Sequence, residues 1–317
     1  MKIIMYHYVR DYKKTDYPDI KGLDIESFKF QIKYLKTKYN ILSPNQIYKI
    51  IENHKSFNDN DCWLTFDDGY IDHYKYVLPI LEHNGIKASF FPSVKTTLNE
   101  TVLDVNKIHF ILATNVSHDL IINEIRNTYI NLNTENRFEN FDDLIKKIDT
   151  SSRFDSSKIM LIKLLLQEVL PKNIRTDICD KLFKNYVSAE IKSFAKNLYM
   201  NISQVKEMRK LGHEIGMHGY DHVRLGKLNK EEQINEIMKA HKFLKENELI
   251  DNKFSISYPY GHYNSDTLEI LSSINCLIGI TTQPSPVDKK NYVALELPRL
   301  DTNDFPQKEK EINDKMH

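Results

Sequence analysis

An alternation of short apolar runs with helix-like segments, interrupted once, constrains this chain more than any other feature. Between the runs, apolar residues recur at the three- and four-residue spacing of an amphipathic helix. Repeated strand–helix units of this kind predict an α/β fold with parallel strands, either an open sheet or a barrel. Seven runs are expected to form strands: 2–6, 61–66, 86–91, 213–218, 254–258, 276–281 and 292–297.

The interruption covers residues 97–200, a block that contains no glycine. Strand patterns are hard to find there, and apolar residues again recur at helical spacing, as at Ile159, Ile162, Leu165 and Leu166. The block is therefore expected to be a helical insertion. It divides a discontinuous α/β domain, 1–96 and 201–305, and residues 306–317 are expected to form a polar C-terminal tail.

Composition excludes several classes of protein. With 44 Lys and Arg against 44 Asp and Glu, and 41% hydrophobic residues, the chain is neither disordered nor a cationic nucleic-acid binder. The chain has three cysteines and no CxxC pair, which argues against a structural zinc ribbon and against a disulfide framework. The apolar run at the N-terminus ends at Tyr6 and His7, and no window is long enough to span a membrane. We therefore expect a cytoplasmic protein.

Chemically informative side chains follow the expected strands. In parallel α/β folds, functional sites form at the carboxyl ends of strands, so loops far apart in the sequence meet there. We expect one shared site for these residues: His7, Asp67, Asp68, His218, His222, Tyr258, Pro259, Tyr260 and Arg299.

Two of these groups suit a metal. A helix N-cap would account for one of the adjacent carboxylates Asp67 and Asp68, but less well for both. His218 and His222 are spaced i, i+4, which lets both imidazoles meet one cation on a helix or tight turn, although two surface histidines are the alternative. Two histidines, one carboxylate and an open position for water would make a hydrolytic metal site.

These motifs resemble those of the polysaccharide deacetylases, the NodB-homology group or carbohydrate esterase family 4. Thr65-Phe-Asp-Asp-Gly69 resembles the first signature, His218-Gly-Tyr-Asp-His222 the histidine motif, and Tyr258-Pro-Tyr-Gly-His-Tyr-Asn264 the third motif. The resemblance covers about residues 1–96 and 201–305. It implies a distorted (β/α) barrel of about seven parallel strands with a helical insertion.

The resemblance also implies roles for the site residues. Asp68, His218 and His222 would hold a divalent metal, usually zinc, with cobalt, nickel or manganese as alternatives. Asp67 would be the general base, and a backbone N–H near Tyr260 would stabilise the oxyanion. Pro259, Tyr258 and Arg299 would line the substrate side, where aromatic rings, among them Tyr70, suit a sugar face. Arg299 could instead orient Asp67 or form a plain ion pair.

The chain departs from the family pattern at two points. The late motif that usually supplies a histidine as general acid reads Leu295-Glu-Leu-Pro-Arg299 here, and Ser257 stands where an arginine often precedes the third motif. His7, within Met5-Tyr-His-Tyr-Val9, is similar to an N-terminal histidine that is a proposed acid in the branch with biofilm poly-N-acetylglucosamine deacetylases. We therefore assign the acid to His7, with a structural histidine as the alternative.

The expected function is metal-dependent removal of an N-acetyl group from an N-acetylated sugar, an intermediate of surface polysaccharide or glycan biosynthesis. A deformylase, another amide hydrolase, or a glycan-binding barrel without activity are the alternatives. A magnesium-dependent phosphoryl-transfer enzyme is disfavoured by the histidines, because magnesium prefers oxygen ligands. The expected partner is the sugar or glycan, with no nucleic acid and no membrane span, and the sequence does not predict an oligomeric state.

Overall fold

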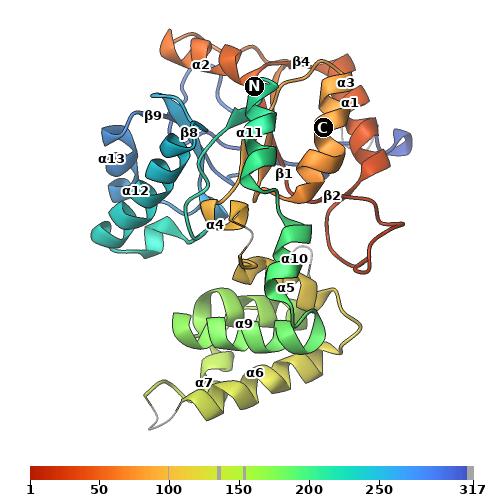
Figure 1. Ribbon diagram of the computed structural model, residues 1–317, viewed down its shortest axis with the longest axis vertical. Coiled ribbons are helices and arrows are strands. Elements are labelled where there is room, and N and C mark those ends of the chain that lie inside the picture. The colour runs from red at the N-terminus through yellow and green to blue at the C-terminus, as the bar shows by residue number, and fades with distance from the viewer. Residues whose placement is uncertain (99, 134–136, 153–154, 313–317) are drawn as a thin grey trace. The chain divides into compact units, whose positions relative to one another are not determined.

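The computed structural model describes residues 1–98, 100–133, 137–152 and 155–312, and it divides the chain into two compact units (Figure 1). The first unit contains Met1–Asp11, Gly22–Thr101 and the chain from Ala195 onward. The second contains Tyr12–Lys21 and Val102–Phe194. Residues 12–21 thus group with the helical unit, which the sequence analysis did not anticipate. Part of the predicted tail, residues 313–317, lies outside the described residues.

The strands of the first unit pair only in parallel. The main sheet has the order β10-β1-β5-β6-β7, and β4 pairs β5 beside this path. Two smaller sheets pair β2 with β3 and β8 with β9. The strands are β1 (Lys2–Tyr6), β2 (Val9–Arg10), β3 (Leu23–Asp24), β4 (Asn40–Ile41), β5 (Asp61–Asp67), β6 (Ser89–Phe91), β7 (Glu214–Ile215), β8 (Phe254–Ser257), β9 (Cys276–Ile280) and β10 (Leu300–Asp301).

The expected α/β fold with parallel strands is therefore confirmed, whereas the barrel is not. The described strands form three sheets, without a closed ring among them. Single parallel bridges join Met217 to Ile256 and Ile280 to Leu297.

One predicted strand is wrong. Residues 292–297 form a turn, in which Glu296 N–H donates to Val293 O, and only Leu297 makes a strand-like bridge. The turn passes directly over Gly279, where an added Cβ would lie 2.3 Å from Leu295 O. The backbone of this segment therefore packs closely over β9 and does not form a regular strand ladder.

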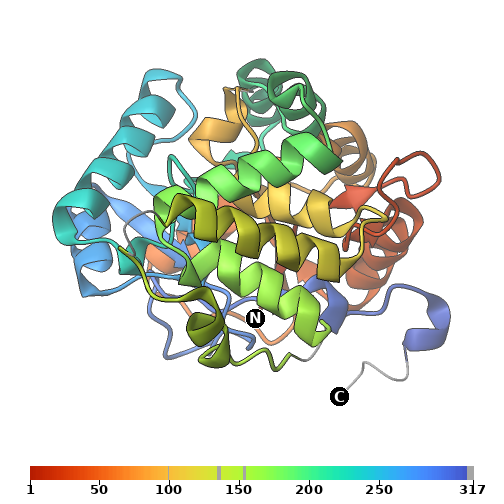
Figure 2. The ribbon, with the colours of Figure 1, turned by 90° about the horizontal axis from the view of Figure 1, so that it is seen from below.

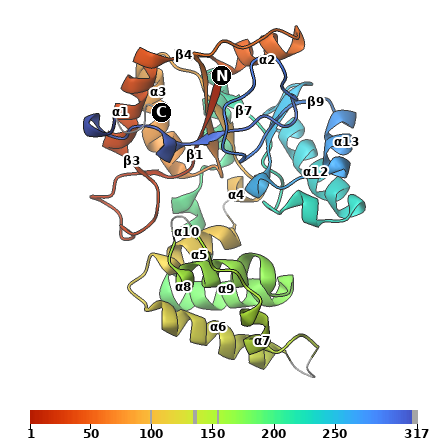
Figure 3. The same cartoon turned by 180° about the vertical axis from the view of Figure 1, so that it is seen from behind.

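Helices surround these strands, with α1 and α3 on one side and α12 and α13 on the other (Figures 1 and 3). Four of them begin with a reciprocal capping box, in which Ser43, Asn201, Asn229 and Asn264 serve as N-caps. The helices are α1 (Ile25–Lys38), α2 (Pro44–Glu52), the π-turn His73–Val77 leading into α3 (Leu78–His83), α4 (Val94–Thr97), α11 (Ile202–Lys210), α12 (Lys230–Glu246) and α13 (Ser265–Ser273).

All regular elements among the described residues of the second unit are helices, and loops connect them. Its helix α9 contacts α5 and α6 (Figure 2), and buried Ile121, Ile125, Ile178 and Leu182 contribute to its interior. The helices are α5 (Asp104–Leu112), α6 (His118–Leu132), α7 (Phe141–Lys146), α8 (Ser157–Leu164) followed by the π-helix Leu165–Val169, α9 (Lys172–Tyr186) and the first half of α10 (Ile191–Leu198), which continues into the first unit. Among the helices described in either unit, none combines the length and apolarity that a membrane span requires.

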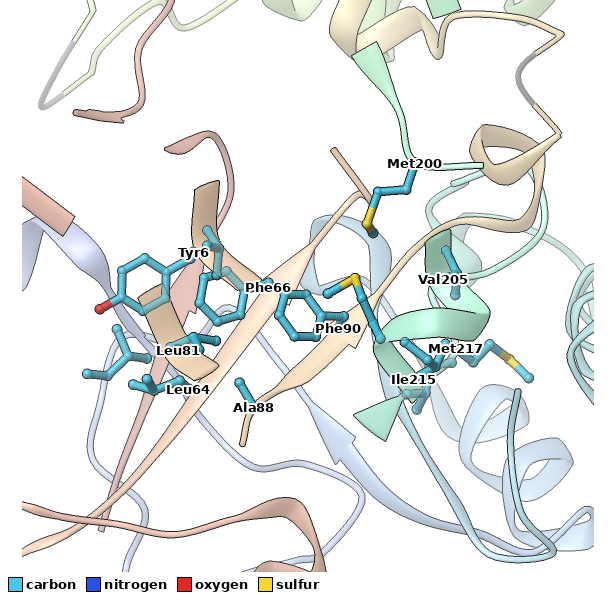
Figure 4. Close-up of a cluster of buried hydrophobic side chains, with 14 of the residues drawn as sticks. Tyr6, Leu64, Phe66, Leu81, Ala88, Phe90, Met200, Val205, Ile215 and Met217 are labelled. Atoms are coloured by element: carbon cyan, nitrogen blue, oxygen red, sulfur yellow. The ribbon is translucent and has the colours of Figure 1, made fainter. Parts of the chain in front are cut away.

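A ladder of aromatic rings fixes the register beneath the candidate site (Figure 4). Tyr6, Phe66 and Phe90 are paired across β1, β5 and β6, and successive ring centroids lie 4.8 Å apart in stacked orientation. Because neighbouring residues of a strand point to opposite faces, Asp67 at the end of β5 points away from this ladder. The core thereby positions the acidic pair at the carboxyl end of the central strand.

Candidate metal and active site

Asp68, His218 and His222 converge on one point of the first unit. Asp68 Oδ1 lies 3.3 Å from His218 Nε2 and 3.2 Å from His222 Nε2, and the three ligand atoms all lie within 4.8 Å of one another. All three side chains are buried. Two imidazoles and one carboxylate at this spacing can share one cation.

Backbone strain concentrates in the same place. Asp68, His222 and Tyr260 adopt left-handed conformations with φ of 70°, 55° and 59°. Asp68 therefore does not continue the extended backbone of β5, and the two histidines lie on an irregular loop outside any helix. Such conformations cost of order 1–3 kcal/mol each and gather at functional sites, where the surrounding structure holds them.

Neighbouring groups orient the three ligands. Tyr70 donates its hydroxyl proton to Asp68 Oδ2 at 2.6 Å, which turns Oδ1 toward the imidazoles. His218 Nδ1 donates to the carbonyl of Ser257 at 2.7 Å, so that Nε2 faces Asp68. Buried Asp68 Oδ1 has no hydrogen-bond partner among the described residues. A cation between these atoms would satisfy it, and the donor set suits zinc better than magnesium.

Electrostatics keeps the ligand carboxylate ionised. Burial raises the pKa of Asp68, but the adjacent imidazoles of His218 and His222 outweigh burial and hold this pKa well below its ordinary value. The charge is therefore available to a cation at neutral pH.

Asp67, the other carboxylate of the acidic pair, is held by Arg299. Arg299 Nη1 and Nη2 donate to the two oxygens of Asp67 at 3.1 and 2.7 Å, and both side chains are buried. Ser257 Oγ donates to Asp67 Oδ2 at 3.0 Å. Burial raises the pKa of Asp67, but the Arg299 charge more than compensates, so the carboxyl has a lowered pKa. The geometry corresponds to the orienting role considered for Arg299.

His7 follows β1, as expected, and lies within electrostatic range of both carboxylates. Its charge is among the causes that lower the pKa values of Asp67 and Asp68. Its backbone carbonyl accepts a hydrogen bond from Nε2 of buried His73 at 2.8 Å. The start of the chain is thus anchored next to the acidic pair.

The third motif is divided between the site and the core. The ring of Tyr260 lies 4.8 Å from the ring of His222, and the Arg224 guanidinium lies 3.8 Å from the Tyr260 centroid. Pro259 is buried beside it. Tyr258, in contrast, is fully buried, stacks on Tyr263 and donates its hydroxyl proton to Leu295 O. The structure therefore places Tyr258 in the packing beneath the motif.

Two contacts of this site were not predicted from the sequence. Tyr70 had been grouped with rings that suit a sugar, yet it is fully buried and bonds Asp68. The Ser257 carbonyl orients His218, and the Ser257 hydroxyl is shared between Arg299 and Asp67. The one sequence signal for these contacts was serine in place of arginine at position 257. A serine there leaves room for the guanidinium of Arg299.

Comparison with known proteins identifies the family. A family model described as "Polysaccharide deacetylase" matches residues 54–109 and 168–277, together more than half of the chain. YxkH of Bacillus subtilis (strain 168), a candidate polysaccharide deacetylase, is 32% identical over 103 residues, which are 31% of this chain. That match spans only 35% of the length of YxkH.

Solved deacetylases share the fold. Streptococcus pyogenes deacetylase PplD in complex with acetate is 18% identical, with a TM-score of 0.56 over 95% of this chain and 91% of PplD. IcaB from Ammonifex degensii is 15% identical, with a TM-score of 0.57 over 94% of this chain and 90% of IcaB. The parallel α/β fold of this chain is thus shared with these solved proteins. The chain belongs to the polysaccharide deacetylase family.

Proposed function

We propose that the protein is a metal-dependent hydrolase that removes an N-acetyl group from an N-acetylated sugar. The observation that carries the proposal is the buried cluster of Asp68, His218 and His222 next to a second carboxylate, Asp67, that a buried arginine holds ionised. Zinc is the metal we assign to the cluster, because two imidazoles and one carboxylate are ligands that zinc commonly takes in hydrolases.

The residues divide the reaction between them. A bound divalent ion would polarise the amide carbonyl and lower the pKa of a water molecule. The Asp67 carboxylate takes the proton of the attacking water, while Arg299 and Ser257 keep that carboxylate in place. The imidazole of His7 gives a proton to the departing amine nitrogen. The backbone N–H of Tyr260 donates to the oxyanion, and Pro259 and the Tyr260 ring border the sugar.

The expected substrate is an intermediate of surface polysaccharide or glycan biosynthesis in the cytoplasm. Support for the acyl group comes from PplD, which was solved in complex with acetate. We also propose that the strands complete a seven-stranded barrel. The bridges Met217–Ile256 and Ile280–Leu297 support this, because they would link β7 to β8, and β9 to the segment that enters β10.

Product analysis tests the proposal. The metal-supplied protein is incubated with N-acetylglucosamine oligomers, with UDP-linked N-acetyl sugars and with the N-formyl analogues of both, and acetate and formate are quantified in parallel. Acetate release that disappears in Asp67→Asn supports the deacetylase. Formate release from formylated analogues alone would favour the deformylase alternative. Full acetate release by Asp67→Asn would show that the base is assigned to the wrong residue.

A further inference from the structure

The loop between the two histidines is fixed by a carboxylate from a distant helix. Glu236, a buried residue of α12, accepts hydrogen bonds on a single oxygen, Oε1, from the backbone N–H groups of Tyr220 and Asp221, each at 2.7 Å. These two residues lie directly between His218 and His222. We propose that Glu236 is a positioning residue that sets the separation of the two histidines for metal binding. The inference rests on the proposed function.

The opposite side of the same loop is held by the start of α4. Ser93 Oγ and Lys95 N–H donate to the carbonyl of Tyr220 at 2.8 and 3.0 Å, and Val94 N–H donates to the carbonyl of Gly219 at 3.2 Å. The loop carbonyls therefore bond α4, and its amides bond Glu236. The bonds to α4 oppose displacement of the loop toward Glu236, and the bonds to Glu236 oppose displacement toward α4.

The local conformation explains why such a clamp is needed. Gly219 and His222 both have left-handed backbones, with φ of 71° and 55°, and for His222 this conformation is unfavourable. A Cβ added at Gly219 would lie 3.0 Å from Glu236 Oε1, so the glycine also allows the carboxylate to approach. Hydrogen bonds that involve an ionised acceptor are stronger than neutral ones. Glu236 thus offsets the strain that brings His222 toward Asp68.

Glu236 acts through the backbone, because the oxygen that faces the loop already accepts two N–H groups. Outer contacts of this kind typically change metal affinity by about 10- to 100-fold when they are removed. The matched comparison is Glu232 on the same helix, whose carboxylate accepts the backbone N–H of Asn229 at 3.0 Å in a capping box. Glu232 supports the helix end and does not contact the histidine loop.

The test is a titration of chelator-treated protein with Co²⁺ and Zn²⁺, followed by the visible spectrum of Co²⁺ and by calorimetry. Glu236→Leu fills the space but cannot accept a hydrogen bond, and we expect at least about tenfold weaker binding. Glu236→Gln keeps an accepting oxygen and should remain within about threefold of wild type. Glu232→Leu should lower the melting temperature and leave the metal affinity unchanged.

A folded Glu236→Leu variant with wild-type affinity would overturn the inference. If that variant does not fold, Glu236→Asp provides the same test, because it keeps the charge but withdraws the oxygen from the loop; wild-type affinity of Glu236→Asp would likewise overturn it. Failure of the proposed function is distinguishable, since in that case the wild-type protein itself binds neither ion. An equal loss of affinity in Glu232→Leu would also contradict a specific role for Glu236.

Discussion

Arg299 is the residue on which the state of the proposed base depends. Its guanidinium meets both oxygens of Asp67, donates through Nε to the carbonyl of Thr281, and is itself almost completely buried. Bidentate pairing fixes the carboxylate in orientation as well as in charge, which a lysine ammonium cannot reproduce. We propose that Arg299, directly before β10, takes the place of the arginine that the family resemblance leads one to expect at position 257.

Replacing Arg299 should impair turnover without removing the metal. We expect Arg299→Lys to lower kcat by about 10²-fold, because general-base catalysis contributes about 10²–10⁴-fold and the base would be misplaced. Metal content should be unchanged, because Asp67 is not a proposed ligand. Steady-state kinetics with metal analysis of the same sample checks this, and a kcat within threefold of wild type would contradict the role given to Arg299.

His73 should make stability depend on pH. Burial lowers its pKa from 6.5 to about 4, so between these values the unfolded chain binds a proton that the folded chain does not. This contribution to stability is complete above pH 6.5 and is lost as the pH falls toward 4, by about 3 kcal/mol in total.

Urea unfolding at several pH values measures this effect. Between pH 7 and pH 4, the free energy of unfolding of the wild type should fall by about 3 kcal/mol more than that of His73→Gln, because glutamine does not bind a proton in this range. The variant retains a donor for the carbonyl of His7, which limits the structural change. Parallel stability curves for the two proteins would show that His73 is not a buried neutral imidazole.

At the scale of elements, Gly279 in β9 allows a neighbouring turn of the chain to pack closely, because glycine has no Cβ. Gly279 N–H donates to Ala294 O and Leu297 N–H donates to Gly279 O, so the turn at 293–297 is bonded to β9 at this glycine. An added Cβ would meet Leu295 O at 2.3 Å and the Tyr258 hydroxyl oxygen at 2.5 Å. Arg299, which binds Asp67, follows this turn directly in the sequence.

Substitution of Gly279 should therefore be costly. Gly279→Ala should destabilise the protein by more than about 2 kcal/mol, as overpacking in cores commonly costs about 1–3 kcal/mol and backbone atoms must move here. Gly85→Ala is the control: its φ is +66° with no atom within 4 Å of the new Cβ, so only backbone strain of about 1 kcal/mol is expected. Equal effects in denaturant unfolding would contradict the steric account.

Sequence patterns predicted the elements where local signals agree. The runs at 2–6 and 61–66 correspond to β1 and β5. The run at 292–297 failed because its backbone forms a turn that packs against Gly279 of β9. The acidic pair and the histidines could be recognised as motifs, whereas Glu236 could not, because it lies on an ordinary amphipathic helix and its role depends on a loop contact.

At the scale of the whole molecule, the three proposed ligands all belong to the first unit. Asp68 comes from its segment Gly22–Thr101, and His218 and His222 come from the chain after Ala195. A metal would therefore join two segments that the second unit separates in the sequence. Ligand binding to the folded state alone adds about 2.7 kcal/mol of stability at a hundredfold excess over Kd.

Removal of the metal should consequently destabilise the protein. Differential scanning calorimetry with zinc and after chelation should show a higher melting temperature for the zinc-loaded wild type. His218→Ala should show no such difference, because one of its three ligands is gone. A zinc-dependent shift of the same size in His218→Ala would place the stabilising ion elsewhere in the molecule.

The central claim is that one buried metal and the adjacent Asp67 act together on an N-acetyl group. The most direct measurement is metal content and acetate release on the same preparations of wild type, Asp67→Asn and His218→Ala. The account predicts one metal per chain and acetate from wild type, metal without acetate from Asp67→Asn, and neither from His218→Ala. Acetate release by a wild type that binds no metal, or undiminished release by Asp67→Asn, would contradict it.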